Sequence, residues 1–367
     1  MFDVITIGSA TQDIFIESDQ GRIFEIREPE AVDSYLAFEY GAKVDVEQVA
    51  FDIGGGAVNT AVNFANLGFK VATIVKMGKD LNAKAVLNRL EEKGADESLV
   101  VRTTKDKTGF SVILTSFEGD RTVLTHRGAN NHIKIEDIPW DAIKNSKWLY
   151  IAPLSGDSNL VLDKIADFAE KNNVSMAFNP GSTQIKQGVD KLKRVIATAE
   201  VLVMNKSEAS HITGIPEGYD QECSDEECSN LKTTNGEFDL WNANVHQMLY
   251  ELKSYKPKVV VITDGNKGVI AFDGKTFYHA PSYPAKVLST LGAGDAFASS
   301  FVAGLEKFNW DIEKAIIYAS INAASIVQSF GAQSGLKTFA EIEQIYEQNK
   351  DFKVTKKNLN VEKIKIS

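Results

Sequence analysis

The chain has 367 residues, 43% of them hydrophobic and 25% charged, which is typical of a soluble globular protein. No basic run offsets its formal net charge of -10, and this argues against nucleic acid or an anionic membrane as a partner. The amino terminus lacks a basic leader region, and no apolar stretch approaches the roughly 20 residues that span a bilayer. We therefore expect a cytoplasmic protein.

The chain opens with a strand and continues with alternating segments. Residues 2–8 form a β-branched apolar run that ends in glycine and predicts a buried strand. Polar and apolar residues alternate over 11–50, which indicates exposed or half-exposed strands. Residues 54–68 begin with three glycines and continue with small apolar residues at helical spacing. They predict a glycine loop, a tightly packed helix and a glycine C-cap.

From residue 70 onward, strand-like and helix-like segments alternate. We expect strands at 70–78, 148–153, 174–180, 199–204 and 258–263, and helices at 82–94 and 159–172. Residues 108–126 predict a hairpin with its turn at Glu118-Gly119-Asp120. This alternation favours an α/β fold, with a mostly parallel sheet flanked by helices on both faces.

Two segments depart from this alternation. Residues 215–240 are acidic and rich in turn residues, so they predict an inserted loop. This segment carries the only two cysteines, Cys223 and Cys228, and only His211 lies near them as a further metal ligand. We interpret the cysteines as reduced thiols. Residues 351–367 are rich in lysine, and they predict either a tail or an edge strand.

The most informative stretch is Thr290–Phe297, a glycine turn that leads into an acidic residue and then into a helical pattern. Small residues at Gly292, Ala293 and Gly294 let backbone N–H groups approach an anion, and a helix amino end adds partial positive charge. Asp295 in that position is either a helix cap or a group that acts on a bound ligand.

Further polar residues follow other strands. Asp13 lies just beyond the first strand, where ligands bind in open α/β sheets, although it could equally be a solvated turn residue. Three glycines before a helix let a polar ligand contact the backbone, with Asn59 one turn into the helix; close packing of that helix is the alternative.

Two more loops fit the same edge of the sheet. Asn205 and Glu208 share a helical face and could reach a hydrated metal–phosphate group, but they are also ordinary capping residues. Thr263, Gly265 and Gly268 belong to a glycine-bearing turn that could instead be a hairpin. The chain has neither a G-x-x-x-x-G-K-[ST] loop nor a strand-linked G-x-G-x-x-G.

Taken together, these segments resemble a known family. Gly54–Gly68 and Thr290–Gly304 resemble, in order and separation, the two signatures of the ribokinase-like (phosphofructokinase-B type) carbohydrate kinases. Gly331-Ala332-Gln333-Ser334 resembles the C-terminal GAQ segment of that family. The resemblance covers nearly the whole chain. It implies a kinase domain over 1–350, with a Rossmann-like sheet and a small β-strand lid made by about 14–50 and 108–126.

The resemblance also implies transfer of the ATP γ-phosphoryl group to a primary hydroxyl. Asp295 is implied as the base, and the amides of Gly292, Ala293 and Gly294 as the anion hole. The residues implied to bind the acceptor are Asp13, Gly55, Gly56 and Asn59. The residues implied to bind ATP are Asn205, Glu208, Thr263, Gly265, Gly268 and Ser320, with Glu208 organising Mg²⁺ through water.

The chain departs from the family pattern in several places. Ser289 stands where the family usually has an aspartate, so a monovalent-cation (potassium) site at Ser289 and Gly331 is only a candidate. Thr11 replaces an asparagine common in ribokinases, which argues against ribose itself. Ser320 occupies the spacing of an asparagine on the purine side, and Asn322 follows two residues later.

The acceptor that we expect is an unphosphorylated sugar, with a nucleoside as the alternative. The Phe178–Gly181 segment lacks the arginine that follows it in several ketosugar-acid and fructose kinases. Arg121 and Arg127 in the lid hairpin could contact a substrate phosphate, but solvated arginines are the simpler interpretation.

The sequence also bears on two alternative functions from other classes of protein and on the oligomeric state. A non-catalytic sugar- or nucleotide-binding protein would be expected to lose Asp295 or its glycine turn. A dinucleotide oxidoreductase would need a G-x-G-x-x-G after the first strand, where only Gly8 occurs. Lid strands in the family often pair between subunits, and unpaired strands in 11–50 would expose their edges, so we expect a homodimer through the lid.

Overall fold

The computed structural model describes residues 1–28, 31–115, 121–217 and 241–358. Three features expected from the sequence lie wholly or largely outside these ranges: the turn at 118–120, most of the acidic segment 215–240 with both cysteines, and the end of the chain after residue 358. Within the described residues, no helix is long and apolar enough to cross a membrane.

The main sheet has nine strands in the order β17-β16-β15-β14-β13-β12-β11-β1-β6. Its parallel part consists of β6 (Val71–Ile74), β1 (Phe2–Ile7), β11 (Ser146–Ile151), β12 (Ser175–Phe178), β13 (Val201–Asn205) and β14 (Val259–Thr263). Its antiparallel edge consists of β15 (Val269–Phe272), β16 (Thr276–Ala280) and β17 (Thr355–Asn358). The end of the chain thus adds an edge strand.

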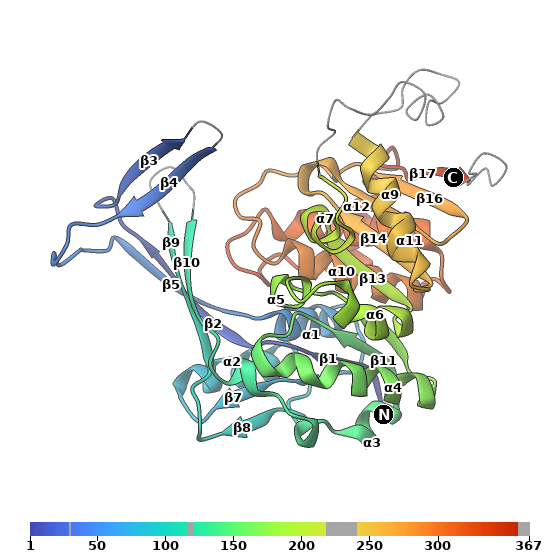
Figure 1. Ribbon diagram of the computed structural model, residues 1–367, viewed down its shortest axis with the longest axis horizontal. Coiled ribbons are helices and arrows are strands. Elements are labelled where there is room, and N and C mark those ends of the chain that lie inside the picture. The colour runs from blue at the N-terminus through green and yellow to red at the C-terminus, as the bar shows by residue number, and fades with distance from the viewer. Residues whose placement is uncertain (29–30, 116–120, 218–240, 359–367) are drawn as a thin grey trace.

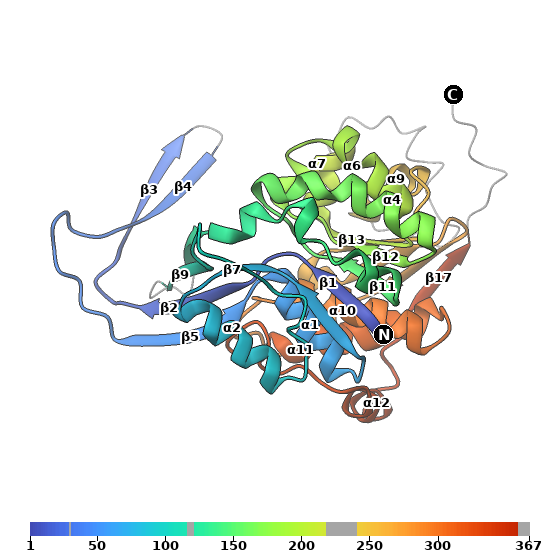
Figure 2. The same cartoon turned by 90° about the horizontal axis from the view of Figure 1, so that it is seen from below.

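Helices cover both faces of the main sheet because its central strands are apolar on both sides (Figures 1 and 2). In β1, Val4 packs on one face, whereas Ile5 and Ile7 pack on the other. The first face holds α1 (Gly56–Asn66), α2 (Leu81–Glu92), α10 (Ala293–Lys307), α11 (Ile312–Ile326) and α12 (Phe339–Gln348). The second face holds α4 (Leu162–Asn172), α6 (Val189–Thr198), α7 (Lys206–Thr213) and α9 (Trp241–Ser254). Two further short helices are α3 (Trp140–Lys144) and α5 (Ser182–Ile185).

A second, smaller sheet projects from the body of the protein (Figure 1). Its order is β10-β9-β2-β5, made of β10 (Arg121–His126), β9 (Gly109–Thr115), β2 (Thr11–Glu17) and β5 (Gln48–Gly54). Beyond it extends a hairpin of β3 (Arg22–Glu28) and β4 (Ala31–Ala37). Two short strands, β7 (Lys76–Gly78) and β8 (Val101–Thr103), pair separately. The expected α/β fold with a mostly parallel sheet and a separate β-strand lid is therefore confirmed.

Candidate functional site

Several strand ends of the main sheet meet at one cavity of about 230 Å³. The residues that line it come from the ends of β11, β12, β13 and β14 and from the starts of α7 and α10. They are Pro153, Asn179, Pro180, Val203, Met204, Asn205, Glu208, Thr263, Gly292, Gly294 and Asp295. The cavity therefore lies at the carboxyl edge of the parallel strands, where open α/β folds bind their ligands.

The amino end of α10 is built around a glycine. Gly292 adopts a left-handed conformation with φ of 80°, and a Cβ atom there would lie 2.6 Å from the carbonyl oxygen of Ala332. Both constraints require glycine. Gly292 and Gly294 line the cavity, whereas the Ala293 N–H donates to the Thr290 carbonyl at 3.3 Å within the turn.

Asp295 lies in the first turn of α10, but no side chain caps that end of the helix among the described residues. Its Oδ2 instead accepts a hydrogen bond of 2.8 Å from Asn59 Nδ2 in α1. Burial raises the pKa of Asp295 to about 6, and the hydrogen bond from Asn59 opposes that rise. A carboxylate with this pKa can accept a proton near neutral pH, as a general base must.

The Asn59 side chain is in turn held by the C-terminal GAQ segment. Gln333 Nε2 donates to Asn59 Oδ1 at 3.0 Å and to the Ile53 carbonyl at 3.0 Å. Arg89 Nη1 donates to Gln333 Oε1 at 2.8 Å and to Asp52 Oδ1 at 3.0 Å. No sequence pattern singles out Arg89 or Asp52, because an arginine on an amphipathic helix and an aspartate in an alternating strand are ordinary.

Asp13 is buried in β2, where it lies directly opposite Asp52 of β5 and Ser111 of β9. Burial raises its pKa, hydrogen bonds with Ser111 and Thr11 oppose this, and the Asp52 charge adds to the rise. A Cβ atom at Gly54 would collide with the Asp13 carboxylate. Thr11, read from the sequence as a departure from ribokinases, is thus a hydrogen-bond partner of Asp13.

The glycines before α1 are explained by close packing. Gly55 has φ of 95°, and a Cβ atom there would lie 2.5 Å from the carbonyl oxygen of Ser9. A Cβ atom at Gly56 would lie 3.0 Å from Pro153, which itself lines the cavity. The packing alternative therefore accounts for both glycines, and it brings the start of α1 against the wall of the cavity.

Asn205 and Glu208 form a capping box at the start of α7. Asn205 Oδ1 accepts from the Glu208 N–H at 2.8 Å, and Glu208 Oε2 accepts from the Asn205 N–H at 2.8 Å. Both residues also line the cavity. The pKa of Glu208 is raised by burial, which a hydrogen bond from Asn205 opposes, and further by the charge of Asp295.

The Thr263–Gly268 turn joins β14 to its antiparallel neighbour β15, so it is indeed a hairpin connection. Thr263 lines the cavity. Gly268 has φ of 99°, and a Cβ atom there would collide with the Ala280 carbonyl, whereas Gly265 faces open space. The turn is tied to the start of α7 by an ion pair of 3.5 Å between Lys206 and Asp264, which the sequence did not suggest.

Many of the candidate residues are not among the described lining residues of this cavity: Asp13, Gly55, Gly56, Asn59, Gly265, Gly268, Ala293, Ser320, Ser289 and Gly331. Ser320 is buried in α11 and is not among the described residues that line this cavity. Its neighbour Asn322 is fully buried, and its Nδ2 donates to Asn63 Oδ1 at 2.9 Å and to Ser300 Oγ at 2.8 Å. Ser289 hydrogen-bonds through its N–H to the Val327 carbonyl at 3.2 Å, and Gly331 lies against the Asp52 carboxylate.

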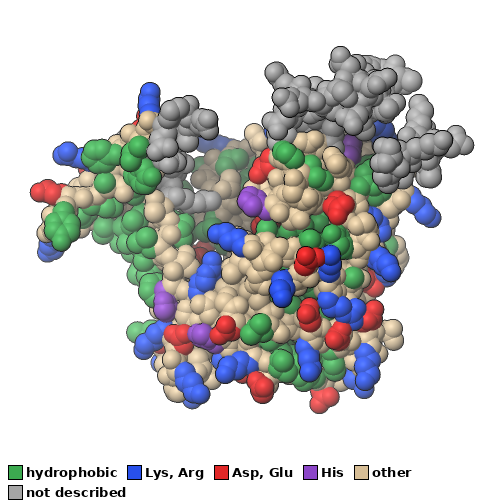
Figure 3. Space-filling model, viewed as in Figure 1, with side chains coloured by type: hydrophobic (Ala, Val, Ile, Leu, Met, Phe, Trp, Pro, Cys, Tyr) green, Lys and Arg blue, Asp and Glu red, His purple; other side chains and the backbone are tan. Residues whose placement is uncertain are grey.

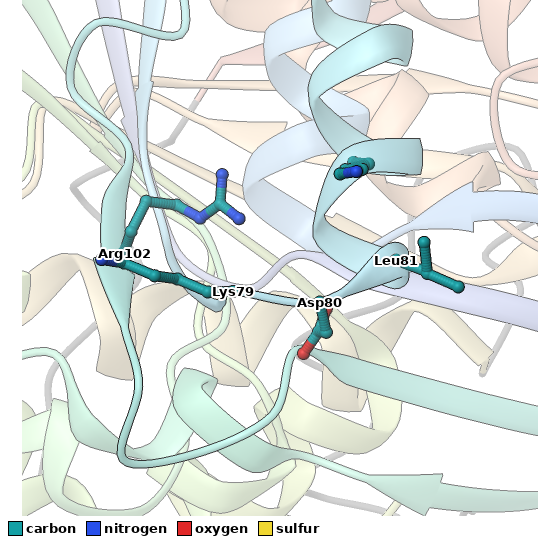
Figure 4. Close-up of a pocket in the computed structure, with 5 residues that line it drawn as sticks. Lys79, Asp80, Leu81 and Arg102 are labelled. Atoms are coloured by element: carbon teal, nitrogen blue, oxygen red, sulfur yellow. The ribbon is translucent and has the colours of Figure 1, made fainter.

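A second cavity, of about 450 Å³, lies at the amino end of α2 and is lined by Lys79, Asp80, Leu81, Lys84 and Arg102 (Figure 4). It shares no lining residue with the first. In it Asp80 caps α2, and Arg102 Nε donates to the Gly78 carbonyl at 3.0 Å.

A parallel α/β sheet with a separate lid sheet, and the partly buried Asp295 carboxylate at the start of α10, fit a phosphotransferase. The family profile described as "pfkB family carbohydrate kinase" matches residues 28–338. The chain belongs to this family, so it is an ATP-binding carbohydrate kinase. The resemblance read from the sequence is thereby confirmed.

Individual relatives of this chain share only about a quarter of its residues. A ribokinase of Staphylococcus aureus (strain COL) is 26% identical over 321 residues, which cover 86% of this chain and 96% of the ribokinase. A 5-dehydro-2-deoxygluconokinase of Geobacillus kaustophilus (strain HTA426) is 27% identical over 317 residues, which cover 83% of this chain and 88% of that enzyme. The names of the two relatives give different acceptors, so they leave the acceptor of this chain open.

Solved structures show the same fold. The ribokinase of Arabidopsis thaliana, complexed with ribose and ATP, aligns with a TM-score of 0.73 at 19% identity and covers 94% of this chain and 98% of its own. An E.coli protein in complex with ATP and Mg²⁺ aligns with a TM-score of 0.71 at 18% identity and covers 95% of this chain and 100% of its own. At these identities the likeness supports the fold alone.

Proposed function

We propose that this protein transfers the γ-phosphoryl group of ATP to a primary hydroxyl of an unphosphorylated sugar. The observation that carries the proposal is the Asp295 carboxylate, which lines the cavity in the first turn of α10 and has a pKa of about 6. A base of this strength is largely ionised at neutral pH, and it can take the proton of an attacking hydroxyl.

The start of α10 supplies the complementary positive potential. The amides of Gly292 and Gly294, together with the dipole of a helix of 15 residues, favour the negative charge of the transferred group. The Ala293 amide contributes less, because it already donates to Thr290 within the turn. Asp295 and this anion hole lie within one helical turn, so a single rigid element positions both.

The charge of the cavity lining suits the binding of ATP together with Mg²⁺. Two carboxylates, Asp295 and Glu208, line it together, and none of its described lining residues is Lys or Arg. A divalent cation would neutralise this negative charge and that of the nucleotide phosphates. Glu208 and Asn205 would hold it through water, and the Thr263, Gly265 and Gly268 turn would contact the nucleotide. ATP and Mg²⁺ are both bound by the E.coli protein of like fold.

The absence of Lys and Arg from the described lining of the cavity also bears on the acceptor. A phosphorylated acceptor would need such a cation, because an unpaired phosphate dianion is costly to bury. Asp13 offers a buried carboxylate that suits vicinal hydroxyls, and both curated relatives act on sugars. A nucleoside, which also carries vicinal hydroxyls, is the second candidate. A monovalent cation near Ser289 and Gly331 stays a candidate cofactor.

A homodimer through the lid completes the proposal. The lid exposes large apolar side chains, seen as green atoms on the projecting lid in Figure 3; among them are Phe24 at 56%, Tyr35 at 51% and Phe51 at 64% exposure. A second copy that covered this face would remove apolar surface from water and pair free strand edges. Light scattering after size exclusion tests the assembly; a monomer at micromolar concentration would reject it.

ADP release tests the activity. We expect a panel of free sugars and nucleosides to contain an acceptor whose turnover falls by about 10²- to 10⁴-fold in Asp295→Asn. Turnover that is independent of Asp295 for every acceptor would reject the proposed mechanism. A nucleoside that outcompetes every free sugar would replace the sugar as acceptor. Omitting K⁺ in the same assay tests the monovalent cation.

A further inference from the structure

Five side chains join the lid, α2 and the GAQ segment to the proposed base. The order of contacts is Asp52, Arg89, Gln333, Asn59 and Asp295, with donor–acceptor distances of 3.0, 2.8, 3.0 and 2.8 Å. Asn59 and Gln333 are 7% and 5% exposed, so water does not compete strongly for their amides. Each contact is between side chains far apart in sequence, and the series joins five separate segments: β5, α2, the GAQ segment, α1 and α10.

The direction of every hydrogen bond in this series agrees with Arg89 as a pure donor at one end and with the Ile53 carbonyl and the Asp295 carboxylate as pure acceptors. A guanidinium only donates, so the group that faces it from Gln333 must be the carbonyl oxygen Oε1. The Gln333 NH₂ group then points the other way, where it donates to the Ile53 carbonyl and to Asn59 Oδ1. Because Asn59 uses its oxygen there, its NH₂ group must face Asp295.

Asp52 fixes the start of the series. Its carboxylate pairs with Arg89 at 3.0 Å and also accepts from the Ile53 N–H at 2.8 Å. The Arg89 side chain is 23% exposed and the Asp52 side chain 15%, so this pair is better shielded from water than a surface ion pair. Asp52 of β5 therefore holds Arg89 in place. Arg89 is not among the residues that line the cavity, so it can reach Asp295 only through Gln333 and Asn59.

We propose that Arg89 and Gln333 are positioning residues that act through Asn59, orienting its amide so that an N–H, and not a carbonyl oxygen, faces Asp295. The inference rests on the proposed role of Asp295 as base. A reversed Asn59 amide would place an oxygen against the carboxylate, which would destabilise the ionised base and displace it from the acceptor hydroxyl.

Substitutions at both positions test the proposal. Arg89→Met removes the donor that orients Gln333, and Gln333→Glu replaces the NH₂ group that faces Asn59 Oδ1 with an acceptor. We expect kcat to fall by about 10- to 100-fold in each variant, with little change in KM for ATP. The acid limb of the kcat/KM pH profile should move to higher pH, because Asp295 loses a donor to its charged form. Arg89→Lys, which keeps a cationic donor, should recover part of the rate.

Arg194→Met is the matched control. Arg194 also pairs with carboxylates, Asp167 at 2.6 Å and Glu170 at 2.7 Å, but these are exposed and remote from the cavity. We expect this variant to keep the wild-type pH profile. Thermal unfolding of all variants separates loss of fold from loss of positioning. If Arg89→Met does not fold, Arg89→Lys and Gln333→Glu carry the test.

A double-variant cycle gives the sharpest outcome. In an Asn59→Ala background, Arg89→Met should cause no additional shift of the acid limb, because the side chain through which Arg89 acts is gone. An additive shift, or wild-type pH profiles for both Arg89→Met and Gln333→Glu, would overturn the inference while the kinase activity stands. Failure of the wild-type protein to phosphorylate any acceptor would instead reject the proposed function.

Discussion

Asn59 Nδ2 donates to Asp295 Oδ2 over 2.8 Å and joins two residues that are 236 positions apart in the chain. The bond links α1, which follows the glycine loop, to the start of α10. It gives the ionised carboxylate a fixed donor in a place where burial works against the charge. Two segments that look like independent ligand loops in the sequence are therefore joined by a hydrogen bond at the proposed base.

The pH profile of the enzyme should reflect the pKa of Asp295, which burial raises and the hydrogen bond from Asn59 lowers. With the pKa of Asp295 at about 6, kcat/KM should be level above that pH and fall about tenfold per pH unit well below it, because the protonated carboxyl cannot act as a base. Steady-state rates between pH 5 and about 8 with saturating ATP measure this. An acid limb near the ordinary pKa of an aspartate would contradict a buried base.

Asn59→Ala should raise the pKa of Asp295 further, because the side-chain hydrogen bond that opposes the effect of burial is removed. The acid limb should shift to higher pH, and kcat should fall at pH 7. Asn59→Asp should have a larger effect, because it places a second carboxylate beside the first. Equal acid limbs in wild type and Asn59→Ala would show that the hydrogen bond does not stabilise the ionised base.

Gly292→Ala should destabilise the protein. The residue has φ of 80°, and the added methyl group would lie 2.6 Å from the Ala332 carbonyl oxygen, so the cost is on the order of 1–3 kcal/mol. Gly294→Ala is the matched control, since a Cβ atom there meets nothing within 4 Å. Urea unfolding of the two variants should separate them, and similar midpoints would refute the strain argument.

The buried asparagine cluster between α1, α10 and α11 should be essential for stability. Asn63 Nδ2 donates to Ser299 Oγ at 2.8 Å and to Ser300 Oγ at 2.9 Å, and Asn322 Nδ2 donates to Asn63 Oδ1. Asn322→Leu would leave buried acceptors without their donor, at a cost of about 1–3 kcal/mol. Thermal unfolding measures the loss, and Asn349→Leu, at an intermediate-exposure site near the end of α12, is a reference.

Asp80 should make stability depend on acid pH. Burial alone would raise the pKa of this carboxyl, but hydrogen bonds from Thr108 and Ala83 outweigh it, and the pKa is lowered. A group with a lowered folded pKa stabilises the fold above its unfolded pKa, and that stabilisation is lost as pH falls through the folded value. Asp80→Asn should therefore flatten the dependence of the unfolding midpoint on pH below about 4.

Local patterns in the sequence were enough to predict the parallel α/β core, the exposed strands and hairpin, and the helix starts at Gly55 and Gly292, whereas the lid followed only from the family resemblance. Each of these depends on neighbouring residues: a continuous apolar strand, an alternating edge strand, or a glycine at positive φ. The family signatures added the class of reaction. None of these patterns carries information about which distant side chains meet.

Only the tertiary structure decided which distant side chains are in contact. It brought Arg89 of α2 onto Gln333 of the GAQ segment, placed Asn322 in buried hydrogen bonds to Asn63 and Ser300, and made Asn205 and Glu208 cap their own helix while they line the cavity. The physical reason is that a hydrogen bond between residues 244 positions apart, as between Arg89 and Gln333, leaves no periodicity or spacing in the sequence. The hydrogen bonds that lead from Arg89 to Asp295 form only because α1, α2 and α10 pack together on one face of the sheet.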